Sequence, residues 1–508
     1  MAISRPFRIF PRRASVPRSQ SNKRISIPPP IGGWNSRDEP INMAPTDAGD
    51  LINLIPRTGF VQMRSGYASH STGNGSGDCD LCVEFYDGTN RQLLTASPTN
   101  IYNATASGAS TSLGAGFTNG RWDTGILGGI MGFVNGADAP QKYDGTTLSA
   151  MTLTGPTATN VIGMHIFKSR SYFWEDNDPN FWYSAVNTLG GTVTEFPLGN
   201  VAKKGGRLLR MTSWTVDGGA GPDDYAVFIM DTGEVIVYQG SDPGSATDWA
   251  LVGIYTIGRP INDRAIVPLG GQIMVVTESD LVTLPEAFNN SSPPPTKLSG
   301  AISDAVFNFG TNDGWQIFHY PIGRLLMINV PTATSPDEFE QYVINLETGA
   351  PCRFTSIPSR VWGLYDGNPY FGSTDGVVYQ FDTGTSDAGS DIEADAITGW
   401  TDLGVAENKM VSAFRPVFEV IGALSYGAAI GFDYDEPTAS IPSSSGGGGS
   451  PWGSSWGSPW GSGTMTQKTW NVANGNGQHL STRLRFARTG DTPRWLRTDY
   501  LVKRGGNL

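Results

Sequence analysis

The chain has 508 residues, of which 65 are glycine and 34 proline, and only 16% are charged. This turn-rich composition favours many short strands over helical bundles and allows two or three domains. The most apolar segments are too short and too rich in glycine to span a membrane, which takes about 20 residues. No apolar stretch follows Arg12-Arg13, so we expect no secretion signal and an intracellular, soluble protein.

Charge is unevenly distributed along the chain. Residues 1–24 carry seven basic side chains and no acidic one, and residues 468–508 carry a net charge of +6. Because the whole chain has a net charge of −12, residues 25–467 carry −25. An acidic body with basic ends is more typical of an assembly component than of an enzyme. Basic ends bind an acidic neighbour, and an acidic body lets DNA pass without adhering.

The N-terminal part divides into two segments. Residues 1–30 form a basic, proline-bearing arm that cannot bury a core, and we expect it to be extended and to anchor the protein to a partner. Residues 31–78 read as a β segment packing on the rest of the protein. Thr46-Asp47-Ala48 is a candidate cap of a short helical turn, and strands are expected at 51–56 and 60–64.

Residues 79–390 read as one repeated strand-turn-strand unit. Short hydrophobic runs alternate with Asp-Gly, Gly-Gly and Asn-Gly turns, as in the hairpin around Asp87-Gly88. Strand ends recur at separations of 37 to 58 residues, and they are Tyr102, Tyr143, Tyr183, Tyr238, Leu284, Tyr342 and Tyr379. This period predicts an all-β fold, a β-propeller of six to eight blades with seven favoured. One short helix is expected at Gly300–Phe307.

Residues 391–508 predict a β-rich platform domain. Longer strands are expected at Val411–Val420 and Tyr426–Tyr434, with Leu480–Phe486 and Trp495–Val502 returning to pair with them. Residues 441–463 form a loop of Gly, Ser and Pro-Trp-Gly-Ser units with three tryptophans. The Gly/Ser part is flexible, and we expect the tryptophans to dock on this chain or on a neighbour.

Tests for chemistry find no catalytic, cofactor or metal site. The four histidines lie in no catalytic signature, and His165 and His319 read as core residues. Cys79, Cys82 and Cys352 lack a second ligand pair for zinc and read as buried or loop thiols. The acidic run Glu175–Asp178 offers a calcium site or a glycosidase pair, but it lacks the glycine and distal glutamate of an EF-hand and reads as a solvated hairpin tip.

The residues expected to make assembly contacts are the basic side chains near both ends and the loop tryptophans. They are Arg5, Arg8, Arg12, Arg13, Arg18, Lys23, Arg24, Trp452, Trp456, Trp460, Arg494, Arg497, Lys503 and Arg504.

Three groups of residues resemble one protein family. They are Gly32-Gly33-Trp34-Asn35-Ser36-Arg37-Asp38 with Met43–Ala48 and Pro56-Arg57; Val237–Pro243 with Trp249–Gly253 and Ile257–Pro260; and Trp495 with Thr498-Asp499 and Lys503-Arg504-Gly505-Gly506. Together they resemble structural proteins of short-tailed bacteriophages, of the tail hub or nozzle kind that is also called packaged-DNA stabilisation or head-to-tail joining protein. The tryptophan loop at residues 441–463 departs from that pattern.

The resemblance implies a non-enzymatic protein in the tail of the virion, made in the host cytoplasm. It implies a homo-oligomeric, hexameric ring below the portal-adaptor (head-to-tail connector) proteins. Double-stranded DNA would pass through the ring and be retained by it, and the outer surface would hold tail spikes or fibres. No catalytic residue is carried over from this family.

Two alternatives stay open. The first is a carbohydrate-binding or depolymerising β-propeller, which requires carboxylates and aromatic side chains converging at the central funnel. The second is a cellular scaffold propeller that binds peptides, which would be monomeric and would bind soluble partners without particles.

Overall fold

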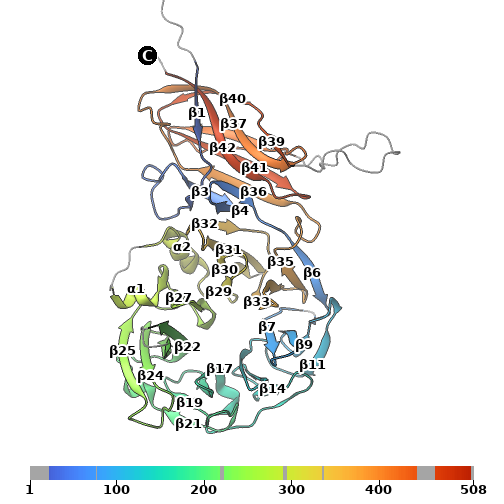
Figure 1. Ribbon diagram of the computed structural model, residues 1–508, viewed down its shortest axis with the longest axis vertical. Coiled ribbons are helices and arrows are strands. Elements are labelled where there is room, and N and C mark those ends of the chain that lie inside the picture. The colour runs from blue at the N-terminus through green and yellow to red at the C-terminus, as the bar shows by residue number, and fades with distance from the viewer. Residues whose placement is uncertain are drawn as a thin grey trace, which may run out of the picture.

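The computed structural model describes residues 22–75, 77–217, 222–289, 295–334, 337–442 and 464–504. In these residues the chain is almost entirely β-structure, arranged as a ring of small sheets and a platform beside it (Figure 1). No helix among the described residues is long and apolar enough to cross a membrane.

The ring is a β-propeller of seven blades, the number that the sequence favours. Blade 1 contains β7 (Leu81–Tyr86), β8 (Arg91–Ala96), β9 (Asn100–Asn103) and β11 (Thr111–Ala115). Blade 2 contains β12 (Asp123–Leu127), β13 (Ile130–Val134), β14 (Gln141–Tyr143) and β15 (Leu148–Ala150). Blade 3 contains β17 (Val161–Phe167), β18 (Arg170–Glu175), β19 (Phe181–Tyr183) and β21 (Thr194–Phe196). Blade 4 contains β22 (Leu208–Asp217), β23 (Pro222–Met230), β24 (Glu234–Gln239) and β25 (Ala250–Thr256).

The remaining blades return the chain to its starting point. Blade 5 contains β26 (Ile266–Leu269), β27 (Gln272–Val276) and β28 (Leu281–Thr283), and blade 6 contains β29 (Gln316–Tyr320), β30 (Leu325–Thr334), β31 (Asp337–Asn345) and β32 (Pro351–Phe354). Blade 7 combines β33 (Val361–Tyr365), β34 (Asn368–Gly372) and β35 (Val378–Phe381) with β6 (Tyr67–Thr72), which pairs with β35. The N-terminal segment therefore closes the ring. The short strands β10 (Gly108–Ala109), β16 (Leu153–Thr154) and β20 (Gly191–Thr192) lie in connections.

The first strand of each blade lies nearest the ring axis. Contacts between neighbouring first strands run from β12 through β17, β22, β26, β29 and β33 to β7. The Asp-Gly turns behave as predicted: the Oδ1 atom of Asp87 accepts the N–H groups of Thr89 and Asn90 at 2.7 Å each, and Gly88 has a φ of 100°. Turn chemistry thus explains these aspartates without a functional role.

The platform consists of two packed sheets. One contains β1 (Lys23–Ile27), β4 (Leu54–Arg57), β5 (Phe60–Met63), β37 (Lys409–Ile421), β39 (Thr464–Gln467), β40 (Asn471–Gly477) and β42 (Arg494–Arg504). The other contains β2 (Gly33–Trp34), β3 (Asp47–Ile52), β36 (Ile392–Thr398), β38 (Gly427–Phe432) and β41 (Leu480–Arg488). The predicted pairing of the late strands with the earlier two is confirmed, because β42 pairs with β37 and β41 pairs with β38.

Two expectations for the N-terminal region are wrong. Residues 23–27, predicted as part of an extended arm that anchors the protein to a partner, form β1 and pair with β42 of the same chain, because Ile25 and Ile27 pack against the platform core. Asp47 begins β3 instead of capping a helical turn, because its carboxylate is held by Asn35 and Lys297.

Helices are few. The predicted helix at Gly300–Phe307 is confirmed as α2 (Ser299–Phe309), whereas α1 (Leu284–Asn289) has no counterpart in the sequence analysis. Among the described residues, three single-turn 3₁₀ helices cover Ala158–Asn160, Leu198–Asn200 and Asp263–Ala265.

The platform and the propeller share one sheet. β32 of blade 6 pairs in parallel with β3, where Ile52 lies opposite Arg353, so blade 6 continues into the platform sheet as nine strands. Beside this junction, the fully buried Arg64 binds Asp387 through two hydrogen bonds of 2.8 and 2.6 Å. Arg64 also donates from Nε to Asn53 Oδ1 at 2.8 Å. Hydrogen bonds in a buried, charged network are short and directional, so they fix the two bodies against each other.

We expect Arg64→Met to lower the free energy of unfolding by about 3–5 kcal/mol, because it leaves Asp387 buried without its counter-ion. Glu347→Gln is the control, since Glu347 forms an exposed ion pair with Arg324 and its loss should cost no more than about 0.5 kcal/mol. Urea denaturation of both variants provides the measurement. Equal, small losses would show that the Arg64 network does not hold the structure together.

Candidate functional site

Charged side chains gather at one mouth of the propeller's central axis. They lie at or just before the first strands of their blades, so the ring brings together positions far apart in sequence. These residues, called the axial cluster, are Asp78, Asp80, Arg121, Asp123, Arg210, Asp263, Arg264, Asp313 and Arg360.

Arg121 reaches across the axis. It precedes the first strand of blade 2, yet its two terminal nitrogens bind Asp263 of blade 5 and Asp313 of blade 6, each at 2.6 Å. In a ring of seven blades, blades 2 and 5 lie on opposite sides. The side chain therefore bridges the central opening.

Further contacts extend the network to every blade. Arg210 of blade 4 binds Asp123 of blade 2 at 3.1 Å, and Asp123 also accepts the backbone N–H of Met164 in blade 3 at 2.9 Å. Arg360 of blade 7 binds Asp313 at 2.9 Å and Asp80, next to blade 1, at 2.6 Å. This mouth of the propeller is thus closed by ion pairs.

The ion pairs hold their members in the charged state. Burial alone would raise the pKa of Asp263, but Arg121 and its neighbouring arginines lower it. Burial alone would lower the pKa of Arg210, but Asp123 raises it. A glycoside hydrolase needs one carboxylic acid whose pKa is raised so that it can donate a proton. Among the described carboxyl groups, burial raises the pKa of Asp50. Asp50 lies in the platform beside Arg353 and not in the axial cluster.

His165 lies on β17, and its Nε2 atom is 2.8 Å from Ser213 Oγ on β22. Burial, together with nearby Arg210, lowers the pKa of His165 to about 3. The ring is therefore neutral at physiological pH and joins two blades by a hydrogen bond. This agrees with the expectation of a satisfied core histidine.

The other candidate sites of the sequence have structural explanations. Glu175 accepts the backbone N–H of Thr157 and the indole N–H of Trp182, and Asp176 pairs with Arg207. The three cysteines are buried free thiols, as expected, and burial raises the pKa of each of them. Within the described ranges, no group of three His, Cys, Asp or Glu residues is placed to hold a metal ion.

The predicted assembly residues of the described chain fall into two places. Lys23 and Arg24 lie on β1 opposite Val502 and Leu501, next to Lys503 and Arg504 of β42. Because the two strands are antiparallel, the chain enters β1 and leaves β42 at the same end. We call this end, with its four basic positions, the basic pole; it lies at the end of the platform far from the propeller (Figure 1).

Arg494 and Arg497 lie apart from the basic pole. They begin β42, so they are about 20–30 Å from Lys503 along the strand. Arg494 pairs with Glu419 at 3.4 Å and lies over the ring of Phe60. Arg497 binds Asp499 at 3.1 Å. These two arginines thus have partners within the chain, and the expected contacts do not form one surface.

Several predicted residues cannot be placed. Arg5, Arg8, Arg12, Arg13, Arg18, Trp452, Trp456 and Trp460 lie outside the described residues.

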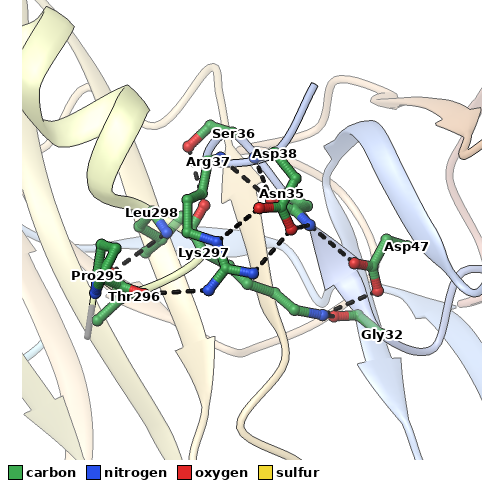
Figure 2. Close-up of polar contacts among 10 residues, drawn as sticks. All are labelled: Gly32, Asn35, Ser36, Arg37, Asp38, Asp47, Pro295, Thr296, Lys297 and Leu298. Atoms are coloured by element: carbon green, nitrogen blue, oxygen red, sulfur yellow. Dashed lines mark hydrogen bonds and ion pairs between the residues drawn. The ribbon is translucent and has the colours of Figure 1, made fainter. Parts of the chain in front are cut away.

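The Gly-Gly-Trp-Asn motif that carried the resemblance builds a polar cluster between the N-terminal segment and the connection before α2. Figure 2 shows Lys297 Nζ donating to Asp47 Oδ1 and to the carbonyl oxygen of Gly32, both at 2.8 Å. Asn35 Nδ2 donates to Asp47 Oδ2 at 2.9 Å. A Cβ atom on Gly32 would lie 2.1 Å from Asp47 Oδ1, so only glycine fits there.

The rest of the motif joins the same connection. Ser36 donates from Oγ and from its backbone N–H to the carbonyl oxygen of Lys297, at 3.0 and 2.9 Å. Its Oγ also accepts the backbone N–H of Ala301 in α2 at 3.0 Å. Arg37 binds Asp38 through two hydrogen bonds of 2.8 and 2.7 Å and donates to the carbonyl oxygen of Pro295 at 3.1 Å. The motif therefore ties the N-terminal segment to the propeller and is structural in this chain.

Comparisons with known proteins add no function. No protein-family model and no curated protein sequence matches the chain. Among solved structures, BBS1N in complex with ARL6DN has a TM-score of 0.41 and 9% identity, over 64% of this chain and all of that one. YCF48 bound to D1 peptide has a TM-score of 0.38 and 7% identity, over 65% and 97% of the two chains. The exo-β-1,3-galactanase of Phanerochaete chrysosporium has a TM-score of 0.27 and 12% identity, over 75% and 95%.

The sequence analysis missed the axial cluster. The available signal was a charged residue at or just before the first strand of a repeat, as at Asp80, Arg121, Asp263, Asp313 and Arg360. These residues are isolated in the sequence, and only closure of the ring places them together.

We expect the free energy of unfolding to decrease as the pH is lowered from 6 to 4, in part because of His165. In the unfolded chain His165 binds a proton with a pKa of about 6.5. In the folded protein it stays neutral down to about pH 3, so acid favours unfolding. In His165→Gln, the slope of the unfolding free energy against pH should be smaller by up to about 1.4 kcal/mol per pH unit. His479→Gln, at a half-buried position beside Tyr434, is the control, and equal slopes in His165→Gln and wild type would contradict the assignment.

Proposed function

We propose that the chain is a structural subunit of a short-tailed phage tail, forming a nozzle or hub ring below the portal-adaptor. In this role it extends the DNA channel, helps retain packaged DNA and offers docking surface for spikes or fibres. Six copies form the ring, which is assembled from protein made in the host cytoplasm. The basic pole is the observation that carries this proposal.

The basic pole supports anchoring because it gathers charge that the sequence keeps at opposite ends. Residues 1–24 contain seven basic side chains and no acidic one, and the last two of these residues, Lys23 and Arg24, lie on the strand that pairs with β42 next to Lys503 and Arg504. A positive surface at one end of a chain with a net charge of −12 favours binding to an acidic partner at that end. Repeated around a ring, six such contacts give strong attachment from modest individual affinities.

Each propeller is closed at its central axis. This supports a path for DNA that runs between copies of the chain and not through the centre of one propeller. Arg121 bridges the opening of a single subunit, so no duplex can thread it. The axial ion pairs nearly cancel one another, and the excess negative charge of residues 25–467 therefore lies elsewhere on the body. A bore bordered by that body would repel DNA and reduce adhesion.

We expect the purified protein to form a species of about 326 kDa, six times the 54.3 kDa of one chain. Cyclic symmetry lets each subunit bind its neighbour through the same contact, so the ring closes at a fixed number. Mass photometry over a range of concentrations measures the distribution. A monomer that persists at all concentrations and also in the presence of phage heads would contradict the ring.

We expect the triple variant Lys23→Glu, Arg24→Glu and Lys503→Glu to lose at least about tenfold in attachment to phage heads bearing the adaptor. The control carries the same charge change on the propeller, at the exposed Lys142, Lys203 and Lys204. Co-sedimentation at several salt concentrations measures binding, and wild-type binding should weaken as salt rises. If both triple variants bind like wild type, the basic pole is not the anchor.

A further inference from the structure

A notch of about 510 Å³ lies between blade 6 and blade 7. Its charged side chains are Glu338 and Glu340 of β31, and its lining includes the aromatic side chains of Tyr67 and Phe339. A volume of this size holds a small ligand or a few residues of an extended chain. We call it the edge notch.

The edge notch exposes an unpaired edge of β31. This strand begins at Asp337, but β32 pairs with it only from Gln341 to Ile344. The backbone of residues 338–340 therefore has no partner strand on the β32 side within the described chain. β32 ends at Phe354, and Ser356, which has a φ of 64°, turns the chain away from the sheet. An open edge of this kind is a template for the addition of another strand.

The wall opposite this edge is fixed by the Arg64 network. The carbonyl oxygen of Thr355 accepts from Arg64 Nη2 at 3.2 Å, and its backbone N–H donates to Asn53 Oδ1 at 3.1 Å. The hydroxyl group of Tyr67 donates to the carbonyl oxygen of Ser356 at 3.3 Å. The notch is thus formed in advance of any ligand, which lowers the entropic cost of binding.

The edge notch carries an excess of negative charge. Glu338 is exposed and forms no ion pair or hydrogen bond with the described part of the chain. Glu340 shares the guanidinium of Arg353 with Asp50, which lies 2.7 Å from it, whereas Glu340 lies 3.3 Å away. Three carboxylates along this part of the sheet therefore have one guanidinium between them. The surplus favours a cationic occupant.

The N-terminal arm contains a segment of the opposite charge. Residues 5–13 include four arginines and no acidic residue. Between Pro6 and Pro11 lie Phe7-Arg8-Ile9-Phe10, and aromatic and β-branched residues favour strands. Proline lacks the backbone N–H that a strand ladder requires, so an added strand ends at both prolines. A short strand of this length matches the short open edge of β31.

The arm is long enough to reach the edge notch of its own chain. Lys23 lies opposite Val502 at the basic pole, and Arg494 lies at the junction end of the same strand. The part of β42 between them spans about 27 Å, whereas residues 11–22 span up to about 40 Å when extended. Residues 19–22, Ser-Gln-Ser-Asn, include turn-forming types directly before β1, so the chain can reverse there.

We propose that Phe7–Phe10 adds a short strand to the open edge of β31 in the edge notch of the same chain. Backbone hydrogen bonds hold this strand, and the flanking arginines pair with Glu338 and Glu340. Because the arm is tethered to the platform, its high effective concentration favours this contact over binding by a separate chain. Docking covers an edge that would otherwise pair with another protein. The inference does not depend on the proposed tail function.

Disulfide trapping in the full chain tests the contact. We expect Ile9→Cys/Ser356→Cys to form an intrachain disulfide at least about tenfold faster than Ile9→Cys/Ser149→Cys, because Ser149 lies exposed on β15 of blade 2. The three native cysteines are buried and do not compete. Electrophoresis without reductant separates the cross-linked chain from a covalent dimer. Equal rates for the two pairs, or a dimer in place of the intrachain product, would overturn the proposal.

Charge reversal in the same cross-linking pair separates recognition of the arm from chance collision. We expect Glu338→Arg to lower the rate at least about fivefold, and the addition of Arg5→Glu and Arg8→Glu to restore it in part, because the attraction returns with its signs exchanged. Glu347→Arg is the matched control, since Glu347 is exposed on the same blade and pairs with Arg324 outside the notch. An unchanged rate in Glu338→Arg, or no recovery in the combined variant, would overturn the assignment.

Discussion

The buried ion pair between Arg64 and Asp387 is the constraint on which the relation of platform to propeller depends. Asn53 completes it: with a φ of 56°, it accepts from Arg64 and donates to the carbonyl oxygen of Glu393 at 2.7 Å. The chain passes this point on its way into the propeller and again on its way out. A pair this deeply buried tolerates little change in geometry, so the two bodies behave as one block.

A single block suits a ring subunit, because contacts made at the platform then position the propeller as well. The shared nine-stranded sheet and the contacts of Lys297 with Gly32 and Asp47 in Figure 2 add two further connections between the N-terminal segment and the blades. The axial ion pairs have a different effect. They link blades across the ring and close its centre, so that in the proposed tail ring neighbours and DNA would meet the outer surfaces of the body.

Local chemistry explains which features could be predicted from sequence. Asp-Gly turns such as Asp87-Gly88 and the alternation in β42 are encoded by adjacent residues, so the propeller, α2 and the pairing of the late strands followed from them. The pairing of β6 with β35 in blade 7 and the pairing of β1 with β42 join residues hundreds of positions apart. The axial cluster has the same origin: Arg121 and Asp263 have ordinary neighbours in sequence, and the ring alone makes them partners.

Electron cryo-microscopy of the assembled protein tests the central claim most directly, because it shows the block, its copies and the path of DNA together. The account predicts a ring in which every copy has the same angle between platform and propeller, with the basic poles on one face. DNA density should lie in the bore between copies, and each propeller axis should be closed at Arg121. Single subunits with variable angles, or DNA threading one propeller, would contradict it.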